Sequence, residues 1–242
     1  MKIHNVAQGS TEWLQLRAGV PTASELDAIL TPEFKVRTGE MPRTYQARKL
    51  AEWWLGGPLP SFKSFQMEQG NVLEDEAKPW YSLETGEEIT NVGFCTTDDG
   101  QVGCSPDGLL GDAGGIEIKC PLAETHVRYL LAGELPKDYT VQVHASMFVT
   151  GRKWWKFVSY RRGFPALVLT VELDDEIVAK IEDALGTFLE AFTEGKSRMT
   201  TINGGPPHRA PLGRCTRCGK PLGAGMKGYC SAECMNDPDL IP

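Results

Sequence analysis

Apolar positions in the first half of the chain follow two different spacings. Residues 42–55 and 65–86 mix apolar and charged side chains in the manner of helices, and Pro79 is expected to kink or divide the second. Shorter apolar runs, bounded by Asp and Gly turn signals, predict strands instead. The predicted strands are 89–96, 101–105 and 115–120.

The second half of the chain continues with two helices, two strands and a closing helix. The helices are predicted at about 124–132 and 138–150, and the strands at about 154–161 and 166–173. The closing helix, 175–195, has apolar residues at helical spacing. Strands grouped between helices, without regular alternation, indicate an α/β (α+β) sandwich with a mixed central sheet flanked by helices.

Length and composition divide the chain into a large domain and a small C-terminal part. The 242 residues suit one domain of about 200 residues with an appendage. Residues 197–213 are polar and rich in Gly and Pro, which is typical of a linker. We therefore expect a domain over 1–196, this linker, and a separate module over 214–242.

Net charge and hydropathy limit the classes of protein to which the chain can belong. The net charge of −7 does not favour a nonspecific coat on nucleic acid, but it does not exclude a nuclease, whose acids can surround a metal ion. The chain has no run of about 18 apolar residues, and its first residues lack the apolar segment of a signal peptide. A cytoplasmic protein with reduced thiols and no membrane span is expected.

Two carboxylates and a lysine in the middle of the chain suggest hydrolytic chemistry. Alternate side chains of a strand share a face, so Glu117 and Lys119 should point the same way while their neighbours face the core. Asp107 lies on the preceding turn. Asp107 and Glu117 can hold Mg²⁺, and Lys119 can orient or help to deprotonate a water. Taken alone, Glu-x-Lys is more often an ordinary charge pair on a surface hairpin.

A second group, near the N-terminus, suits an anion. Thr22-x-x-Glu25 is a capping box, which predicts a helix that begins near residue 23 with Ser24 in its first turn. The free N–H groups and positive dipole end of such a turn favour a phosphate. Arg17, a few residues earlier, is of a residue type that can give a phosphate two charge-assisted hydrogen bonds.

Five blocks, in order and at compatible spacing, resemble the lambda-exonuclease-like viral recombinase nucleases of the PD-(D/E)XK superfamily. The blocks are Trp13-x-x-x-Arg17 with Thr22-Ala23-Ser24-Glu25; Gly70-x-x-x-Glu74; Cys104-Ser105-Pro106-Asp107-Gly108-Leu109; Glu117-Ile118-Lys119-Cys120-Pro121; and Gln142-Val143 with Ser146-Met147 and Val149-Thr150. The resemblance implies a role for each matching residue. These are metal ligands Asp107, Glu117 and the Ile118 carbonyl; catalytic residues Lys119, Glu74 and Gln142; and a 5′-phosphate pocket of Arg17, Ser24 and Ser105.

The resemblance also implies an activity. The implied activity is that of a Mg²⁺- or Mn²⁺-dependent exonuclease that degrades double-stranded DNA from a 5′ end and leaves a 3′ tail for a phage-type single-strand annealing protein. The family is often a homotrimer in a phage or prophage setting. Two alternatives remain open: a structure- or sequence-specific endonuclease of the same superfamily, and a nonenzymatic DNA-binding or docking factor. His126 and His144 are interpreted as groove or packing residues.

Seven cysteines fall into two groups. Cys95, Cys104 and Cys120 lie in or beside predicted strands and suit small core positions. The other four form two close pairs, which favours a tetrahedral Zn²⁺ site. Two disulfides or an iron–sulfur cluster are the alternatives, and DNA contact, protein docking and a structural cap are all compatible roles. The four predicted zinc ligands are Cys215, Cys218, Cys230 and Cys234.

Overall fold

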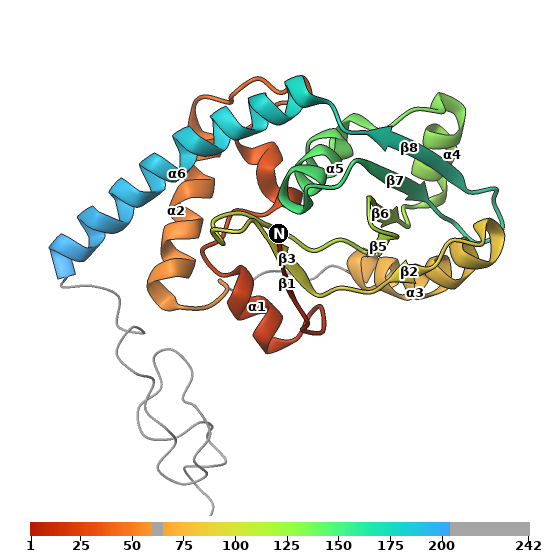
Figure 1. Cartoon of the computed structure of the whole chain (residues 1–242), viewed down its shortest axis with the longest axis horizontal. Helices are drawn as coiled ribbons and strands as arrows, with labels where there is room; N and C mark the ends of the chain where they lie inside the picture. Colours follow the sequence, from red (N-terminus) through yellow and green to blue (C-terminus); the bar gives the residue numbers. More distant parts are fainter. Residues whose placement is uncertain (60–64, 204–242) are drawn as a thin grey trace, which may run out of the picture.

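The computed structural model describes the backbone of residues 1–59 and 65–203, with side chains for 1–59 and 73–202. A mixed five-stranded sheet forms its centre, in the order β2–β5–β6–β7–β8 (Figure 1). β6 and β7 run parallel, whereas the other neighbours are antiparallel. The predicted mixed central sheet is therefore confirmed. The strands are β2 (Ile89–Thr90), β5 (Gly108–Leu110), β6 (Gly114–Lys119), β7 (Trp154–Ser159) and β8 (Leu167–Glu172).

Two helices cover the opposite faces of this sheet, α3 (Phe65–Thr85) and α5 (Lys137–Thr150). Ile116 and Ile118 of β6 pack in one buried cluster with residues of α3. Trp155 and Phe157 of β7 pack in a second cluster with Val143 and Met147 of α5. Alternating strand residues therefore enter two apolar layers, which is the flanked sandwich that the sequence predicts.

A third apolar cluster joins the remaining helices. It includes residues of α2 (Glu40–Leu55), α5 and α6 (Asp175–Asn203), among them Tyr45, whose ring lies 5.3 Å from that of Phe188. The apolar residues predicted to bury the closing helix belong to this cluster or pack against it: Ile177, Ile181, Leu185, Phe188 and Phe192. The other helices are α1 (Thr11–Arg17) and α4 (Ala123–Ala132). No helix in the described residues is long and apolar enough to cross a membrane.

The predicted strand 89–96 divides between two sheets. Its first part is β2, and its last part is β3 (Phe94–Thr96), which lies between β1 (Lys2–His4) and β4 (Gly103–Cys104) in a small antiparallel sheet. Gly93 separates the two parts, and a Cβ there would lie 2.0 Å from the carbonyl oxygen of Val6. The close passage of the N-terminal segment therefore requires glycine at the point where the strand breaks.

Helix boundaries differ from the predictions in two places. Pro79 lies inside α3 and does not divide it. α6 continues to Asn203, so the first residues of the predicted linker are helical, with hydroxyl groups such as that of Thr201 bonded to carbonyls one turn earlier. The rest of the linker and the module over 214–242, with its four cysteines, lie outside the described residues.

The helix predicted near residue 23 is a short 3-10 helix, Ala23–Ala28, and its capping box does not form. The Thr22 hydroxyl donates to the Glu25 carboxylate at 3.1 Å, and no side-chain bond caps the helix. Glu25 instead turns towards basic residues of α2. The competing attraction of two cations explains why this carboxylate leaves the helix end.

Candidate active site

Glu117 and Lys119 of β6 lie side by side on the face that α5 covers. Lys119 Nζ is 2.6 Å from Glu117 Oε1, so the predicted shared face is confirmed. Gln142 of α5 donates from Nε2 to the same oxygen at 2.6 Å. Glu117 is only 3% exposed. Its carboxylate is therefore held in a buried position by one ammonium and one amide.

Asp107 reaches the same place from the turn between β4 and β5. Its Oδ2 accepts the backbone N–H of Ile118 at 2.5 Å, which ties the turn to the strand between Glu117 and Lys119. Burial, followed by the charges of Glu117 and Glu74, raises the pKa of Asp107 well above its ordinary value. A carboxylate that is costly to ionise beside a second carboxylate is typical of a functional site that receives a cation.

Lys119 remains a charged ammonium in this environment. Burial alone lowers its pKa, but the carboxylates of Glu117 and Asp107 outweigh that effect and raise the pKa above its ordinary value. The ammonium also lies 5.1 Å from the centre of the Tyr139 ring. A charged Lys119 can donate hydrogen bonds to a water molecule or to negative charge that develops on a substrate.

The donor set around Asp107 and Glu117 fits a hard divalent cation. Glu117 Oε2 is buried and has no hydrogen-bond partner among the described residues, a costly arrangement that a ligand would relieve. Within the same residues, no three His, Cys, Asp or Glu side chains are grouped to hold a metal by themselves. Mg²⁺ suits such a place, because it takes one or two carboxylates and keeps several waters. The Ile118 carbonyl would supply a further oxygen.

Glu74 lies on α3 at the edge of this cluster. It pairs with Lys78 one turn later, at 3.2 Å, and its charge contributes to the raised pKa of Asp107. Glu74 and Lys78 line a cavity of about 800 Å³ together with Trp13 and residues 5–9 and 91–93. Glu74, whose charge acts on Asp107, therefore borders an open space that can admit a substrate.

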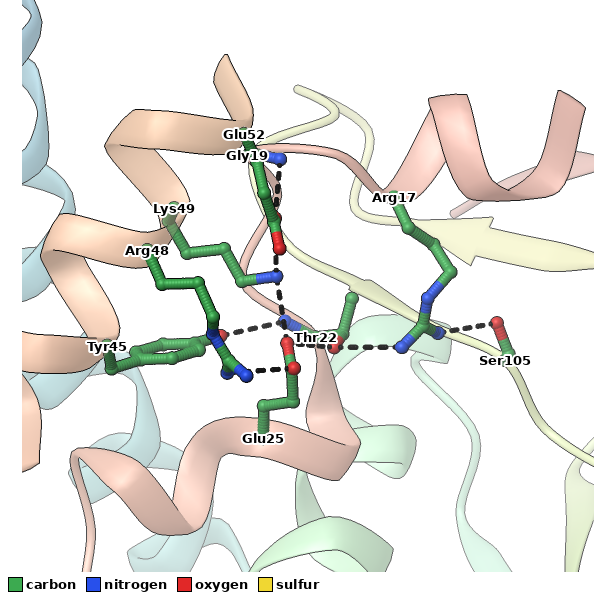
Figure 2. A network of polar contacts seen from close by, with 9 residues as sticks. All are labelled: Arg17, Gly19, Thr22, Glu25, Tyr45, Arg48, Lys49, Glu52 and Ser105. Atoms are coloured by element: carbon green, nitrogen blue, oxygen red, sulfur yellow. Dashed lines mark hydrogen bonds and ion pairs between the residues drawn. The ribbon is translucent and has the colours of Figure 1, made fainter. Parts of the chain in front are cut away.

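Arg17 and Ser105 meet to form a second, cationic site (Figure 2). Arg17 Nη1 donates to Ser105 Oγ at 2.9 Å, and Nη2 donates to Thr22 Oγ1 at 3.4 Å. The guanidinium carbon lies 4.4 Å from the centre of the Trp13 ring, and the Trp13 indole N–H also donates to Ser105 Oγ. Ser105 comes two residues before Asp107, so one short segment joins the two sites.

Ser24 forms no hydrogen bond with Arg17 or Ser105, and its part in the phosphate pocket stays a prediction. Its side chain is exposed and forms no hydrogen bond with the described residues. The sequence did not assign contacts to Trp13 or Thr22, which the structure brings to Arg17. The spacing of Trp13 and Arg17, four residues apart on one helix, is a local signal that predicts the first of these contacts.

An ion network that includes residues of α2 lies beside the cationic site and is linked to it through Thr22 (Figure 2). Lys49 Nζ is 2.8 Å from Glu25 Oε2 and 3.0 Å from Glu52 Oε2, and its side chain is 4% exposed. Arg48 binds the other oxygen of Glu25 at 2.9 Å. Glu52 also accepts the N–H of Gly19 at 3.0 Å. Each carboxylate has a cationic partner, which offsets the cost of burying its charge.

Two histidines prove to be packing residues. His126 is fully buried, with its ring nitrogens 2.7 Å from Ser159 Oγ and 2.9 Å from the Pro165 carbonyl oxygen. His144 packs edge-on against the Phe34 ring. Burial lowers the pKa of His144. Neither ring contacts the carboxylate cluster.

Comparison with known proteins gives one family match and several similar structures. The YqaJ-like viral recombinase domain matches residues 12–153. The crystal structure of an alkaline exonuclease (LHK-Exo) from Laribacter hongkongensis has 30% identity and a TM-score of 0.73, covering 81% of this chain and 98% of that one. Its complex with dAMP gives 31% identity, the same TM-score and the same coverage.

A more distant structure shares the fold alone. A phage-related exonuclease from Haemophilus somnus 129PT has 12% identity and a TM-score of 0.52, covering 82% of this chain and 97% of that chain. No curated protein matches the sequence. The match with the L. hongkongensis enzyme extends through nearly all of that chain.

Proposed function

Because the chain belongs to the YqaJ-like viral recombinase family, we propose that it is a metal-dependent exonuclease acting 5′ to 3′ on double-stranded DNA ends. One observation carries the proposal. Ser105 holds Arg17, and Asp107, two residues later, is bonded to the strand of Glu117 and Lys119. A cationic site for a terminal phosphate thus adjoins a carboxylate site for a metal.

Each residue of the two sites has a distinct task in this proposal. Arg17 and Ser105 bind the 5′-phosphate and thereby place the next phosphodiester at the carboxylates. Gln142 and Lys119 fix Glu117, and the Lys119 ammonium orients water or stabilises negative charge. Glu74 contributes negative charge from α3. A Mg²⁺ or Mn²⁺ ion held by Asp107, Glu117 and the Ile118 carbonyl would supply Lewis-acid activation.

Digestion of labelled linear duplex tests the activity. Each end is labelled separately, with or without a 5′-phosphate, and Mg²⁺ is either supplied or chelated. We expect nucleotides to be released from the 5′-phosphorylated strand in Mg²⁺, a 3′ tail to remain, and covalently closed circles to stay intact. Cleavage of closed circles would favour the endonuclease alternative, and absence of metal-dependent cleavage would favour the DNA-binding alternative.

Substituting Arg17 tests the cationic site. Arg17→Ala should slow digestion of 5′-phosphorylated ends by roughly tenfold to a hundredfold, because hydrogen bonds to charged groups usually contribute that much to binding. Digestion of 5′-hydroxyl ends should change little, because the metal site remains. Rates on both ends are measured, with Arg198→Ala on the exposed face of α6 as the control. Equal slowing of both ends would remove Arg17 from phosphate recognition.

Zinc in the C-terminal module remains a prediction from the sequence. Elemental analysis should find about one Zn²⁺ per chain, bound by Cys215, Cys218, Cys230 and Cys234. Cys218→Ser should lose that zinc, whereas Cys120→Ser, just after β6, should retain it. Iron with sulfide, or two disulfides without metal, would contradict the assignment.

A chain cut after residue 203 should keep a folded nuclease domain.

Assembly and biological partners follow from the family resemblance. We propose that the 3′ tail passes to a single-strand annealing protein, that the chain forms a homotrimer, and that it works in the cytoplasm of a bacterial host. Sedimentation of the purified protein tests the trimer.

A further inference from the structure

Among the described residues, no carboxylate directly neutralises the positive charge of Arg17. In the described part of the chain its polar contacts are the hydroxyl groups of Ser105 and Thr22, and its face lies against Trp13. It forms no ion pair there. Burial lowers the pKa of Arg17, and the charged group that opposes this most strongly is Glu25. A half-buried guanidinium held by neutral hydroxyls is therefore available to an anion.

Of the acids in the described part of the chain, Glu25 is the best placed to occupy that site. A single hydroxyl separates it from Arg17, because Thr22 Oγ1 accepts from Arg17 Nη2 at 3.4 Å and donates to Glu25 Oε2 at 3.1 Å (Figure 2). The Glu25 side chain is 26% exposed, so it has room to change rotamer. An unrestrained Glu25 would form an internal ion pair with Arg17 and compete with a phosphate.

Lys49 restrains Glu25. Its ammonium binds Glu25 Oε2 at 2.8 Å, and it is held from the other side by Glu52 at 3.0 Å. Glu52 is in turn fixed by the N–H of Gly19. Gly19 has a φ of +73°, and a Cβ there would lie 2.9 Å from the Cβ of Trp53, so α2 and this loop are pressed together. Lys49 thus has little freedom to release the carboxylate.

We propose that Lys49 is a positioning residue that keeps the Arg17 site open for a 5′-phosphate by holding Glu25 away from Arg17. The inference rests on the proposed function, and it makes phosphate preference depend on a side chain that does not touch DNA. Arg48 binds the same carboxylate, but its side chain is 43% exposed, so solvent weakens its hold on Glu25. Lys49 therefore dominates the restraint.

Three variants test the proposal through the ratio of initial rates on 5′-phosphate and 5′-hydroxyl duplex ends. Lys49→Met should lower this ratio by roughly tenfold or more, since a charge-assisted contact to phosphate is lost, while the rate on 5′-hydroxyl ends is retained. Adding Glu25→Gln to Lys49→Met should restore the ratio, because the competing carboxylate is gone. Arg48→Met, the matched control, should leave the ratio within about twofold of wild type.

Thermal unfolding confirms that each variant is folded. If Lys49→Met does not fold, Lys49→Met with Glu52→Gln replaces it, because this pair also removes the buried carboxylate that Lys49 would leave behind. An unchanged ratio in the folded variant would overturn the proposal, as would a ratio that Glu25→Gln fails to restore. Absence of any phosphate preference in the wild-type protein would instead overturn the 5′-phosphate pocket of the proposed function.

Discussion

Replacing Lys119 with alanine should reduce DNA cleavage by about 10²–10⁴-fold, the usual contribution of a positioned proton-transfer or water-orienting group. Lys119 is the cation of the cluster, 2.6 Å from Glu117 Oε1 and held charged by Glu117 and Asp107. Its loss removes the ammonium beside Glu117, whereas Asp107 and Glu117 remain to bind metal. Nucleotide release from linear duplex under single-turnover conditions measures the effect.

The matched control for this substitution is Lys153→Ala. Lys153 is exposed just before β7, so its removal should leave cleavage within about twofold of wild type. The melting temperature of Lys119→Ala in Mg²⁺ distinguishes lost chemistry from lost folding. Turnover near the wild-type rate in a folded Lys119→Ala protein would exclude Lys119 from the reaction.

The shared face of Glu117 and Lys119 was predictable because strand alternation is a local rule. Once 115–120 is assigned as a strand, the side chains two residues apart must point the same way. The apolar spacing of 175–195 was predictive for the same reason, since Ile181, Leu185 and Phe188 enter one buried cluster.

The breaks and pairings that the sequence did not reveal depend on distant residues. The strand 89–96 divides because β1, at the start of the chain, pairs with its second part. β5 was not among the predicted strands, yet it pairs with β6 over its whole length. The capping box at Thr22 and Glu25 is lost to Lys49 and Arg48, which α2 brings from more than twenty positions away.

Neutralising Asp107 should strongly reduce the stabilising effect of Mg²⁺. In wild type we expect the melting temperature to rise with Mg²⁺, because a ligand of the folded state stabilises it. Asp107→Asn removes one of two proposed carboxylate ligands and should weaken metal binding by at least the roughly 10–100-fold that losing a supporting partner costs. The rate of DNA cleavage should fall together with the affinity for metal. Glu117→Gln should behave alike, whereas Asp112→Asn, exposed on the β5–β6 turn, should keep the metal response.

In the absence of metal, Asp107→Asn should stabilise the fold at neutral pH instead of weakening it. Folding raises the pKa of Asp107, chiefly through burial and the charge of Glu117, so ionised Asp107 opposes folding. Stability without metal should therefore fall as pH rises from the ordinary Asp range to the raised pKa of Asp107. Asp107→Asn should lack this pH dependence and be at least as stable as wild type above that range. Without metal, an Asp107→Asn protein less stable than wild type at neutral pH would contradict the raised pKa of Asp107. An Asp107→Asn protein that keeps the wild-type response to added Mg²⁺ would place the metal elsewhere.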